Sequence, residues 1–431
     1  MMLKVCVVGL GYIGLPTAII FAKHGVQVHG VDVNSTVVEA LNNGELHLEE
    51  PGLKEALHEA LTCGRLSFST EPTLADAFII SVQTPALADH TADLSFVKAA
   101  AASIVPYLMR GSLVIVESTV PPKTVEEVVI PILLQSKLDI GNELYVAHSP
   151  ERVIPGNILV EMVTNTRIVG GINDRSTEKA IELYRSFVRA NIIGTDIRTA
   201  EMVKLMENTY RDINIAYANE LARIAERIGF DIWEAISLAN THPRVHIQQP
   251  GPGVGGHCIA VDPWFIVSSA PEQARLIAMA RTINAETPMH IAHRIEGIVG
   301  EQEKPVVTAF GLAYKGNIDD TRESPSLSVI KILKDKGFII NIYDPHVEGD
   351  FQNKFNCPYD AAFGSDCIVI LTDHEVFKDM NYSKIKDQMR IPNLFDTRNI
   401  LDAAAMRELG YRCFGFGPAW QIEKGERSRG L

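Results

Sequence analysis

Short apolar runs alternate with helix-compatible stretches through the first third of the chain. Each run has the length and the apolar character that are typical of buried strands. The runs are Lys4–Val8, Val26–Val31, Ala77–Val82, Leu113–Ser118 and Leu144–Ala147. Because strands that alternate with helices pair in parallel sheets, the pattern predicts a doubly wound α/β domain, which we assign to residues 1–198.

The middle of the chain has a helical pattern instead. Residues Thr199–Ile228 contain neither Gly nor Pro, and their apolar positions recur with the period of a helix. Further along, Asp231 and Glu234 have the spacing of an N-terminal capping box, which predicts another helix that is bounded by Pro243. We assign a helical connector domain to residues 199–299.

The alternation of strand-like and helix-like segments resumes at Pro305. The strand candidates here are Val306–Phe310, Phe338–Tyr343, Cys367–Leu371 and Asn393–Phe395. They predict a second α/β domain over residues 300–431, whose charged end, Glu423–Leu431, is expected to fray. The predicted fold class is therefore α/β, with two Rossmann-like doubly wound domains joined by a helical connector.

One segment near the start of the chain has a second interpretation. Val5–Ala22 carries no charged residue and lies between Lys4 and Lys23, as in a signal peptide or a short membrane span. Three glycines and Pro16 interrupt this segment, and another strand-like run follows at once. We therefore favour a buried strand, a turn and a helix, and we expect no targeting or membrane segment.

The composition narrows the class of function. The 431 residues include 40 basic and 53 acidic side chains, and the resulting formal charge of −13 disfavours nucleic acid and anionic membranes as partners. A local basic cluster must therefore hold any anionic ligand. The six cysteines lack a CxxC or zinc-like pairing, which predicts free thiols in a reducing compartment. Because no other long apolar run appears, the cytoplasm is the default location.

A glycine-rich turn follows the first predicted strand. It reads Gly9-Leu10-Gly11-Tyr12-Ile13-Gly14, the GxGxxG spacing that lets a backbone approach a pyrophosphate at a helix N-terminus. Asp32 ends the next strand and is placed to accept hydrogen bonds from a ribose, which favours NAD over NADP. A glycine turn that binds no ligand is the alternative. Thr84 and Thr119 follow later strands and could line the same crevice or cap turns.

A second glycine-rich loop, Pro250–Phe265, presents a thiol. Its sequence, PGPGVGGHCIAVDPWF, places Cys258 four residues before Asp262. Structural cysteines usually lie within apolar strands or helices, as Cys6 and Cys367 are predicted to do. Cys258 is therefore a candidate nucleophile that nearby cations would activate, and an inert loop cysteine is the alternative.

The long middle helix gathers polar residues in one narrow arc. At about 100° per residue, Lys204, Asn208 and Arg211 share a face that could line an anionic site or simply be solvated. Roughly the opposite face is apolar. That face carries Met206, Tyr210, Ile213, Tyr217, Leu221 and Ile224.

Together these segments resemble the UDP-glucose/GDP-mannose dehydrogenase family, and within it the branch whose substrate is UDP-N-acetyl-D-mannosamine. The resemblance is carried, in the family's order, by GLGYIGLPTA from Gly9, SPERVIPG from Ser149, TAEMVKLMENTYRDINIAYANEL from Thr199, HPRV from His242, PGPGVGGHCIAVDPWF from Pro250 and FGLAYKGNIDDTRESP from Phe310. It extends over all three predicted domains.

The resemblance implies a metal-free, NAD-dependent, four-electron oxidation of the sugar C6 alcohol to a carboxylate. Cys258 matches the nucleophile that forms a thiohemiacetal and then a thioester. Lys204 matches the lysine that transfers protons and stabilises the oxyanion. Asn208 and Asp262 match positions that hold the reacting centre and the water.

The resemblance also assigns further residues. Glu151 matches the glutamate associated with thioester hydrolysis, and Thr119 matches a threonine near the nicotinamide. Substrate contacts are implied for Arg152, Val153, Lys204, Asn208, Arg211, His242, Arg244, Gly255, Tyr314, Lys315 and Arg398. The loop with His242 and Arg244 is implied to reach a neighbouring subunit, which predicts a homodimer through the helical domain.

Three questions stay open at this level. Arg322 matches an arginine that reaches NAD, but a salt bridge to Asp319 or Asp320 is an alternative role. His257 and Val261 depart from the thiol loop of the UDP-glucose branch, which disfavours glucose but leaves UDP-N-acetylglucosamine and UDP-N-acetylgalactosamine as substrates. A product that enters surface polysaccharide is implied by the family alone.

Two other classes of function fit part of the same sequence. A 3-hydroxyacid or 6-phosphogluconate type of dehydrogenase uses lysine and asparagine on its connector helix without a thiol, and would make one NADH per turnover. A non-catalytic NAD-binding module is the other class. The thiol of Cys258 argues against the first, and its coexistence with the arc of Lys204 argues against the second.

Overall fold

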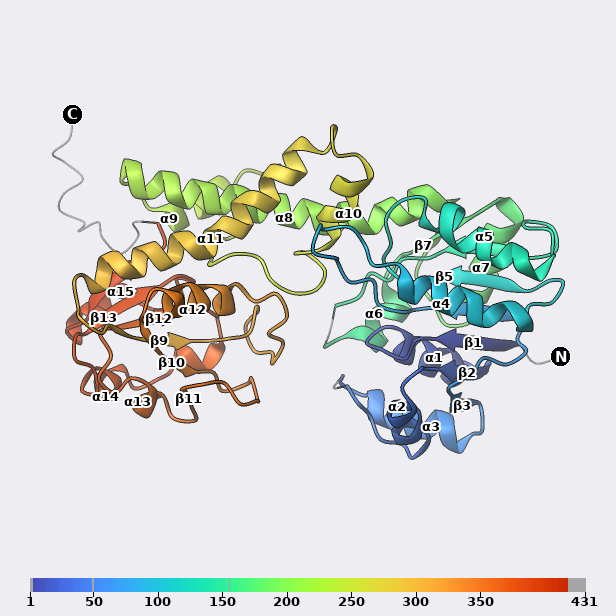
Figure 1. The fold of residues 1–431 in the computed structure, drawn as a ribbon, viewed down its shortest axis with the longest axis horizontal. Coiled ribbons are helices and arrows are strands. Elements are labelled where there is room, and N and C mark those ends of the chain that lie inside the picture. The colour runs from blue at the N-terminus through green and yellow to red at the C-terminus, as the bar shows by residue number, and fades with distance from the viewer. Residues whose placement is uncertain (1–2, 49, 155, 418–431) are drawn as a thin grey trace. The chain divides into compact units, whose positions relative to one another are not determined.

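The computed structural model describes residues 3–48, 50–154 and 156–417, which form two compact units (Figure 1). The first unit comprises the described residues up to Glu207 together with Trp264–Pro271. The second unit comprises Asn208–Pro263 together with the described residues from Glu272 onward.

An eight-stranded sheet forms the centre of the first unit. Its order is β3 (Leu66–Ser69), β2 (Gln27–Val31), β1 (Lys4–Val8), β4 (Ala77–Ile80), β5 (Leu113–Val116), β6 (Tyr145–His148), β7 (Arg167–Gly171) and β8 (Ile192–Asp196). All neighbouring pairs are parallel except β6 and β7, which are antiparallel. The chain order reverses direction between β1 and β4, so their carboxyl ends flank the switch point at which such sheets bind ligands.

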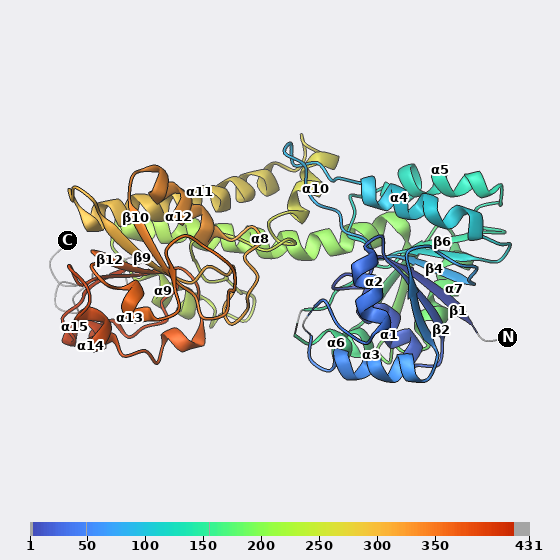
Figure 2. The same cartoon turned by 60° about the horizontal axis from the view of Figure 1, so that its bottom comes forward.

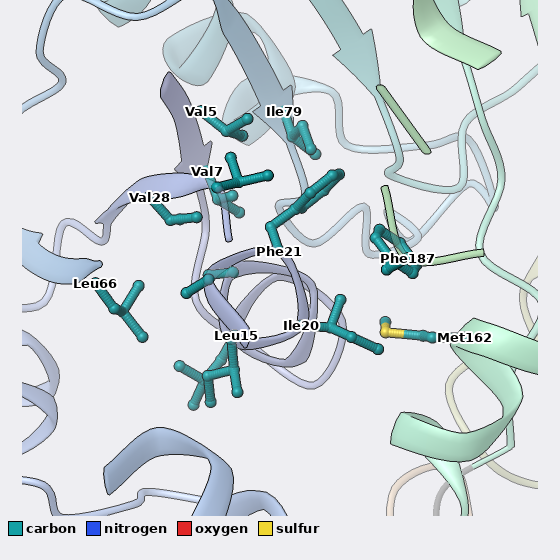
Figure 3. Close-up of a cluster of buried hydrophobic side chains, with 14 of the residues drawn as sticks. Val5, Val7, Leu15, Ile20, Phe21, Val28, Leu66, Ile79, Met162 and Phe187 are labelled. Atoms are coloured by element: carbon teal, nitrogen blue, oxygen red, sulfur yellow. The ribbon is translucent and has the colours of Figure 1, made fainter. Parts of the chain in front are cut away.

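Helices cover both faces of this sheet (Figure 2). One face packs against α1 (Gly14–Lys23), α2 (Ser35–Asn42), α3 (Leu53–Thr62), α6 (Ile158–Thr164) and α7 (Asp174–Tyr184), and the other against α4 (Ser95–Ile104) and α5 (Ile130–Leu133). Short 3₁₀ segments span Val105–Tyr107 and Leu134–Ser136, and a π-helical turn spans Val125–Val129. Figure 3 shows Leu15, Ile20 and Phe21 of α1 in the core beneath β1, where burial of such side chains contributes about 2 kcal/mol each.

The second unit has a six-stranded, fully parallel sheet. Its order is β11 (Lys354–Phe355), β10 (Ile339–Tyr343), β9 (Val306–Phe310), β12 (Cys367–Ile370), β13 (Asn393–Asp396) and β14 (Arg412–Gly415). One face packs against α9 (Ile232–Ala239), α11 (Arg275–Val299) and α12 (Pro325–Asp335), and the other against α13 (Pro358–Ala361), α14 (Tyr382–Lys386) and α15 (Ala403–Glu408). A 3₁₀ turn spans Glu375–Phe377. Helix α10 (Asp262–Ser269) begins in this unit, and its residues from Trp264 onward belong to the first unit.

The longest helix, α8 (Ile197–Ile228), has its polar side turned inward. Its buried positions include Glu201, Asn208, Asp212 and Asn219, each of which is hydrogen-bonded. Its apolar side is exposed. Met206, Tyr210, Tyr217, Ile224 and Ile228 have between 39% and 71% of their surface accessible. Periodicity predicted both faces of this helix, but not which of them would be covered.

The structure confirms the predicted fold class, α/β with two Rossmann-like domains and a helical domain, with two differences. The strands predicted from apolar runs are present to within one or two residues, and Asp231 caps α9 by accepting from the amides of Trp233 and Glu234. The sequence analysis missed β3, β7, β8, β11 and β14, which lie toward the sheet edges, and the first sheet is not wholly parallel.

Three further expectations concern the end of the chain, the domain boundaries and the apolar segment near its start. The segment Glu423–Leu431 lies outside the described residues. The boundaries near 198 and 299 stay a prediction. Val5–Ala22 forms β1, the glycine turn and most of α1. Among the described residues, none of the helices has both the length and the apolar character that crossing a bilayer requires.

Candidate functional site

The turn between β1 and α1 has the shape of a phosphate cradle. Gly9 adopts φ of 94° and donates its amide to the Val31 carbonyl at 2.8 Å. A side chain on Gly9 or Gly14 would collide with backbone, whereas a Cβ on Gly11 would meet no atom within 4 Å. Gly11 therefore borders open space in which a ligand can approach the backbone.

Asp32 lies beside this turn, immediately after β2. Its carboxylate accepts from the amides of Leu10 at 3.0 Å and Asn34 at 2.9 Å, and its side chain stays half-buried. Because a carboxylate has about four lone-pair directions, this leaves capacity for ribose hydroxyls. Tyr12 is exposed and Ile13 packs against the core. The open backbone at Gly11 and the acceptor at Asp32 together fit NAD.

The loops that follow β4 and β5 are joined to each other. The Thr84 hydroxyl donates to the Thr119 carbonyl at 2.5 Å. The Ser118 hydroxyl accepts from the Val82 amide at 2.9 Å and donates to the Val82 carbonyl at 2.7 Å. The structure thus brings Thr84 and Thr119 together at the carboxyl edge of the sheet.

Glu151 belongs to a buried ionic cluster that the sequence analysis missed. The Arg167 guanidinium contacts both Glu151 and Glu117, and it lies 4.1 Å from the ring centre of Tyr184. The Tyr184 hydroxyl donates to Glu117 at 2.6 Å, and the Thr17 hydroxyl donates to the other Glu117 oxygen at 3.2 Å. All three charged side chains are at least nine-tenths buried.

Burial controls the protonation of this cluster. Desolvation raises the pKa of Glu117 although Arg167 opposes it, and the neighbouring charge of Glu151 raises it further. Burial alone would lower the pKa of Arg167, but Glu151 and the other partners raise it overall. Two carboxylates thus share one guanidinium, which keeps Arg167 charged and holds Glu151 in place.

The residues after Glu151 are half-buried. Arg152 forms an ion pair with Glu207 on α8 and donates to the Thr166 carbonyl at 2.9 Å. Val153 packs against the core of the first unit. The Arg152 guanidinium is therefore already paired with a protein carboxylate, and it is not an unpaired cation.

In the second unit, three predicted site residues form a hydrogen-bonded chain. Arg211 donates to the amide oxygen of Asn208, and the Asn208 amide nitrogen donates to the Asp262 carboxylate. Both Asn208 and Asp262 are buried. Lys204 lies one turn before Asn208 on α8 and is also buried, at 9% exposure. The arc predicted from helical periodicity is therefore an inward face and not a solvated one.

Cys258 lies in the turn that leads into α10. Its carbonyl accepts from the amides of Val261 at 3.0 Å and Asp262 at 2.8 Å, and its side chain is half-buried. Cys6 and Cys367 are fully buried in strands, as predicted, and burial raises the pKa of Cys6 to about 11 and that of Cys367 above its usual range. Those two thiols are thus kept protonated, whereas Cys258 is partly accessible.

The thiol loop packs against the loop that follows β9. A Cβ at Gly255 or Gly256 would press on Tyr314, so only glycine permits this approach. The Gly256 amide donates to the Arg322 carbonyl at 2.9 Å, and the Gly251 amide donates to the Asn219 side chain at 2.9 Å. Gly255, Tyr314 and the thiol loop are therefore brought together.

Further basic residues lie at or near the surface of the second unit. Arg398 donates to Asp373 at 2.9 Å, and a Cβ at Gly251 would meet its guanidinium. Lys315 is exposed. Arg322 forms a salt bridge with Asp320, the alternative considered above; burial raises the pKa of Asp320, but the hydrogen bonds from Arg322 lower it overall.

His242 and Arg244 are exposed on the loop after α9. The described residues contain no cluster of histidine, cysteine or carboxylate side chains that could hold a metal ion.

Sequence models of one known family match most of the chain. Those of the UDP-glucose/GDP-mannose dehydrogenase family match its NAD binding domain to residues 3–188, its central domain to 198–286 and its UDP binding domain to 308–403.

Individual relatives agree with these matches. A UDP-N-acetyl-D-mannosamine dehydrogenase of Methanococcus maripaludis is 48% identical over 95% of each chain. An NDP-N-acetyl-D-galactosaminuronic acid dehydrogenase of Ralstonia nicotianae is 44% identical over 93% of this chain and 96% of the relative. The solved structure of the Pyrococcus horikoshii UDP-D-ManNAc dehydrogenase is 42% identical, with a TM-score of 0.91 over 97% of this chain and all of the other.

Proposed function

Because the chain belongs to the UDP-glucose/GDP-mannose dehydrogenase family and is an NAD-dependent dehydrogenase of UDP-sugars, we propose that it oxidises UDP-N-acetyl-D-mannosamine at C6 to UDP-N-acetyl-D-mannosaminuronate. The observation that carries the four-electron outcome is the thiol of Cys258 in a glycine-rich turn, four residues before Asp262. A dehydrogenase that stops after one hydride transfer does not need a nucleophile.

The chemistry is assigned to residues that match the family's motifs. NAD supplies a hydride acceptor for each of the two oxidation steps. Lys204 takes the proton of the C6 hydroxyl and then stabilises the oxygen as it becomes negative. The Cys258 sulfur attacks the aldehyde carbon and forms a thiohemiacetal, whose oxidation leaves a thioester on the same sulfur.

Hydrolysis completes the reaction. A water oxygen bonds to the acyl carbon, the carbon–sulfur bond breaks with its electron pair on Cys258, and Glu151 receives the proton of the water. The ion pair with Arg167 supports this role because it holds the Glu151 carboxylate in one orientation. Asn208 and Asp262, which are hydrogen-bonded to each other, hold the reacting centre and the water.

The substrate's diphosphate needs cationic partners in a chain with a formal charge of −13. The second unit offers Arg211, Lys315 and Arg398, and the match of residues 308–403 to a UDP binding domain supports the assignment of Lys315 and Arg398 to the nucleotide. Tyr314 and Gly255 are in mutual contact and are assigned to the same ligand.

We also propose that the protein is a homodimer built on α8. The exposed apolar side of this helix supports a second copy as its partner, because a row of accessible Met, Tyr and Ile residues is typical of an interface. The exposed positions of His242 and Arg244 are consistent with contacts from these side chains to the substrate in the neighbouring copy's site.

All six cysteines lie in described residues, and none of them forms a disulfide. Free thiols support a cytoplasmic location. Entry of the product into surface polysaccharide rests on the family resemblance.

UDP-N-acetyl-D-galactosamine is the second candidate substrate, because the relative from Ralstonia nicotianae is 44% identical. UDP-N-acetylglucosamine and UDP-glucose are further alternatives. The test incubates the protein with NAD and each of the four sugars, and identifies the product by mass spectrometry. We expect the uronate from UDP-N-acetyl-D-mannosamine, and we expect Cys258→Ser to abolish its formation while leaving NAD affinity unchanged. Unchanged turnover in that variant would remove the thioester from the mechanism.

A further inference from the structure

The two sheets carry the same local device at the end of their central strands. Gly9 follows β1, and Gly311 follows β9; their φ angles are 94° and 99°. Each glycine amide donates to the last carbonyl of the neighbouring strand, at 2.8 Å in the first unit and 2.9 Å in the second. The next amide donates to a carboxylate just beyond that neighbouring strand, to Asp32 in one case and to Asp344 in the other. Asp344 is therefore the counterpart of the ribose-binding acid.

The two carboxylates differ in the number of hydrogen bonds that they accept from the protein. Asp32 accepts two amide hydrogens and is half-buried. Asp344 is 3% exposed and accepts from the amides of Leu312, Ala313, His346 and Val347 and from the Nε2 of His374. Burial would raise the pKa of Asp344, but the bonds from His374 and the amides lower it overall. With five donors around it, Asp344 has no capacity left for a ribose.

His374 supplies a side-chain donor to Asp344, whereas the donors to Asp32 among the described residues are the backbone amides of Leu10 and Asn34. His374 is fully buried, and its Nδ1 accepts from the Asn317 amide at 2.8 Å. Since that nitrogen accepts, the ring proton is on Nε2, which donates to Asp344 at 3.1 Å. One imidazole thus connects the end of the sheet to the far end of the loop 311–317.

Other bonds brace the same loop from the same side. The Thr372 hydroxyl donates to the Ala313 carbonyl at 2.7 Å, and the Glu375 amide donates to the Asn317 side chain at 2.9 Å. Between these anchors lie Tyr314 and Lys315. Tyr314 packs against Gly255 and Gly256, while Lys315 is exposed.

We propose that His374 closes the ribose-type site of the second unit and acts as the positioning residue for the loop 311–317, so that Tyr314 and Lys315 are presented to the uridine diphosphate of the substrate. This inference rests on the proposed function, because it takes a UDP-sugar as the ligand. The second unit then holds its nucleotide by this loop and not by Asp344, and it takes no dinucleotide at that acid.

The test measures UDP binding to the full chain by calorimetry in the absence of NAD, together with kcat and KM for the UDP-sugar. His374→Phe keeps the ring volume but loses both hydrogen bonds, and we expect UDP to bind about ten- to a hundredfold more weakly. KM for the UDP-sugar should rise by the same factor, while NAD affinity stays unchanged. His374→Gln keeps one donor and one acceptor and should restore most of the UDP affinity.

His148 offers a matched control, because it is also a fully buried histidine but lies in the other sheet and its Nδ1 accepts no hydrogen bond. His148→Phe should leave UDP affinity unchanged. A His374→Phe variant that binds UDP as tightly as wild type would overturn the inference. Wild-type protein that binds no UDP would instead contradict the proposed function.

A measurement on the unmodified protein covers the case in which His374→Phe does not fold. With ¹⁵N-labelled histidine, the His374 signals are assigned by their loss in His374→Gln. We expect the Nε2–H tautomer, slow exchange of that proton, and a shift of the ring signals on addition of UDP. An Nδ1–H tautomer, or ring signals that do not shift when UDP is added, would overturn the inference.

Discussion

Gly11 provides a direct test of the phosphate cradle, because the structure separates its ligand role from any folding role. A methyl group on its Cα would meet no other atom within 4 Å, and its φ is not in the left-handed region. Alanine therefore fits the folded protein, and Gly11→Ala should change the free energy of unfolding by no more than about 0.5 kcal/mol.

The same substitution should impair NAD binding strongly. The added methyl group occupies the space through which a pyrophosphate approaches the backbone of the turn. Loss of one charge-assisted hydrogen bond costs about 1.5–3 kcal/mol. Since about 1.4 kcal/mol corresponds to a tenfold change, the Kd for NAD should rise about ten- to a hundredfold.

Two other glycines give contrasting controls. Gly14→Ala would place its methyl group against the Gly9 carbonyl, so that variant should lose stability even without a ligand. Gly297 lies exposed in α11 with open space around it, and Gly297→Ala should be neutral or stabilising by up to about 1 kcal/mol without affecting NAD.

The assay combines calorimetric titration of NAD with chemical unfolding in its absence. The reasoning predicts a Gly11→Ala protein that unfolds like wild type but binds NAD weakly. Wild-type NAD affinity in that variant would refute the placement of the pyrophosphate at this turn, and loss of stability without NAD would refute the claim that Gly11 has no structural role.

Three further predictions concern stability and assembly. Arg167→Met leaves two buried carboxylates without a cation and should lower the free energy of unfolding by about 3–5 kcal/mol, whereas Arg390→Met, whose side chain is 49% exposed, should cost much less in the same denaturant titration. Burial lowers the pKa of His148 to about 3, so the folded state keeps it neutral while the unfolded chain takes up a proton below about pH 6.5. The contribution of His148 to the free energy of unfolding is complete above that pH and falls by about 1.4 kcal/mol per pH unit as the pH drops toward 3. Urea titrations near pH 7 and pH 5 should therefore show that the stability of His148→Phe depends less on pH than that of wild type. An equal pH dependence in the two proteins would contradict this. Tyr210→Glu places a charge on the exposed apolar side of α8 and should convert the proposed dimer to a monomer in sedimentation equilibrium; a dimer mass in the variant would exclude that face as the interface.

Features that depend on neighbours in the sequence were predictable. The strand, turn and helix around Gly9 follow from glycine spacing and apolar run length, which act over a few residues. The length of α8 follows from the absence of Gly and Pro over Thr199–Ile228. The thiol loop was recognisable because a cysteine among glycines is unusual for a packed residue.

Features that depend on distant partners were not predictable. Edge strands such as β14 contain few apolar residues, and pairing with a neighbour stabilises them more than their own composition does. The cluster around Arg167 depends on partners that are distant in sequence; Glu117, for example, lies 50 residues before Arg167, and only the fold brings the two together. A signal was present nonetheless, because Arg167 begins an otherwise apolar run and a charged residue there needs a buried partner.

The central claim is tested most directly by the number of NADH molecules released per nucleotide sugar. With UDP-N-acetyl-D-mannosamine limiting and NAD in excess, NADH absorbance at completion is compared with the sugar consumed. The thioester mechanism predicts two NADH per sugar, because oxidation of an alcohol to a carboxylate removes four electrons and each NAD accepts two. A ratio of one would mean that oxidation ends at the aldehyde, and would contradict the role assigned to Cys258.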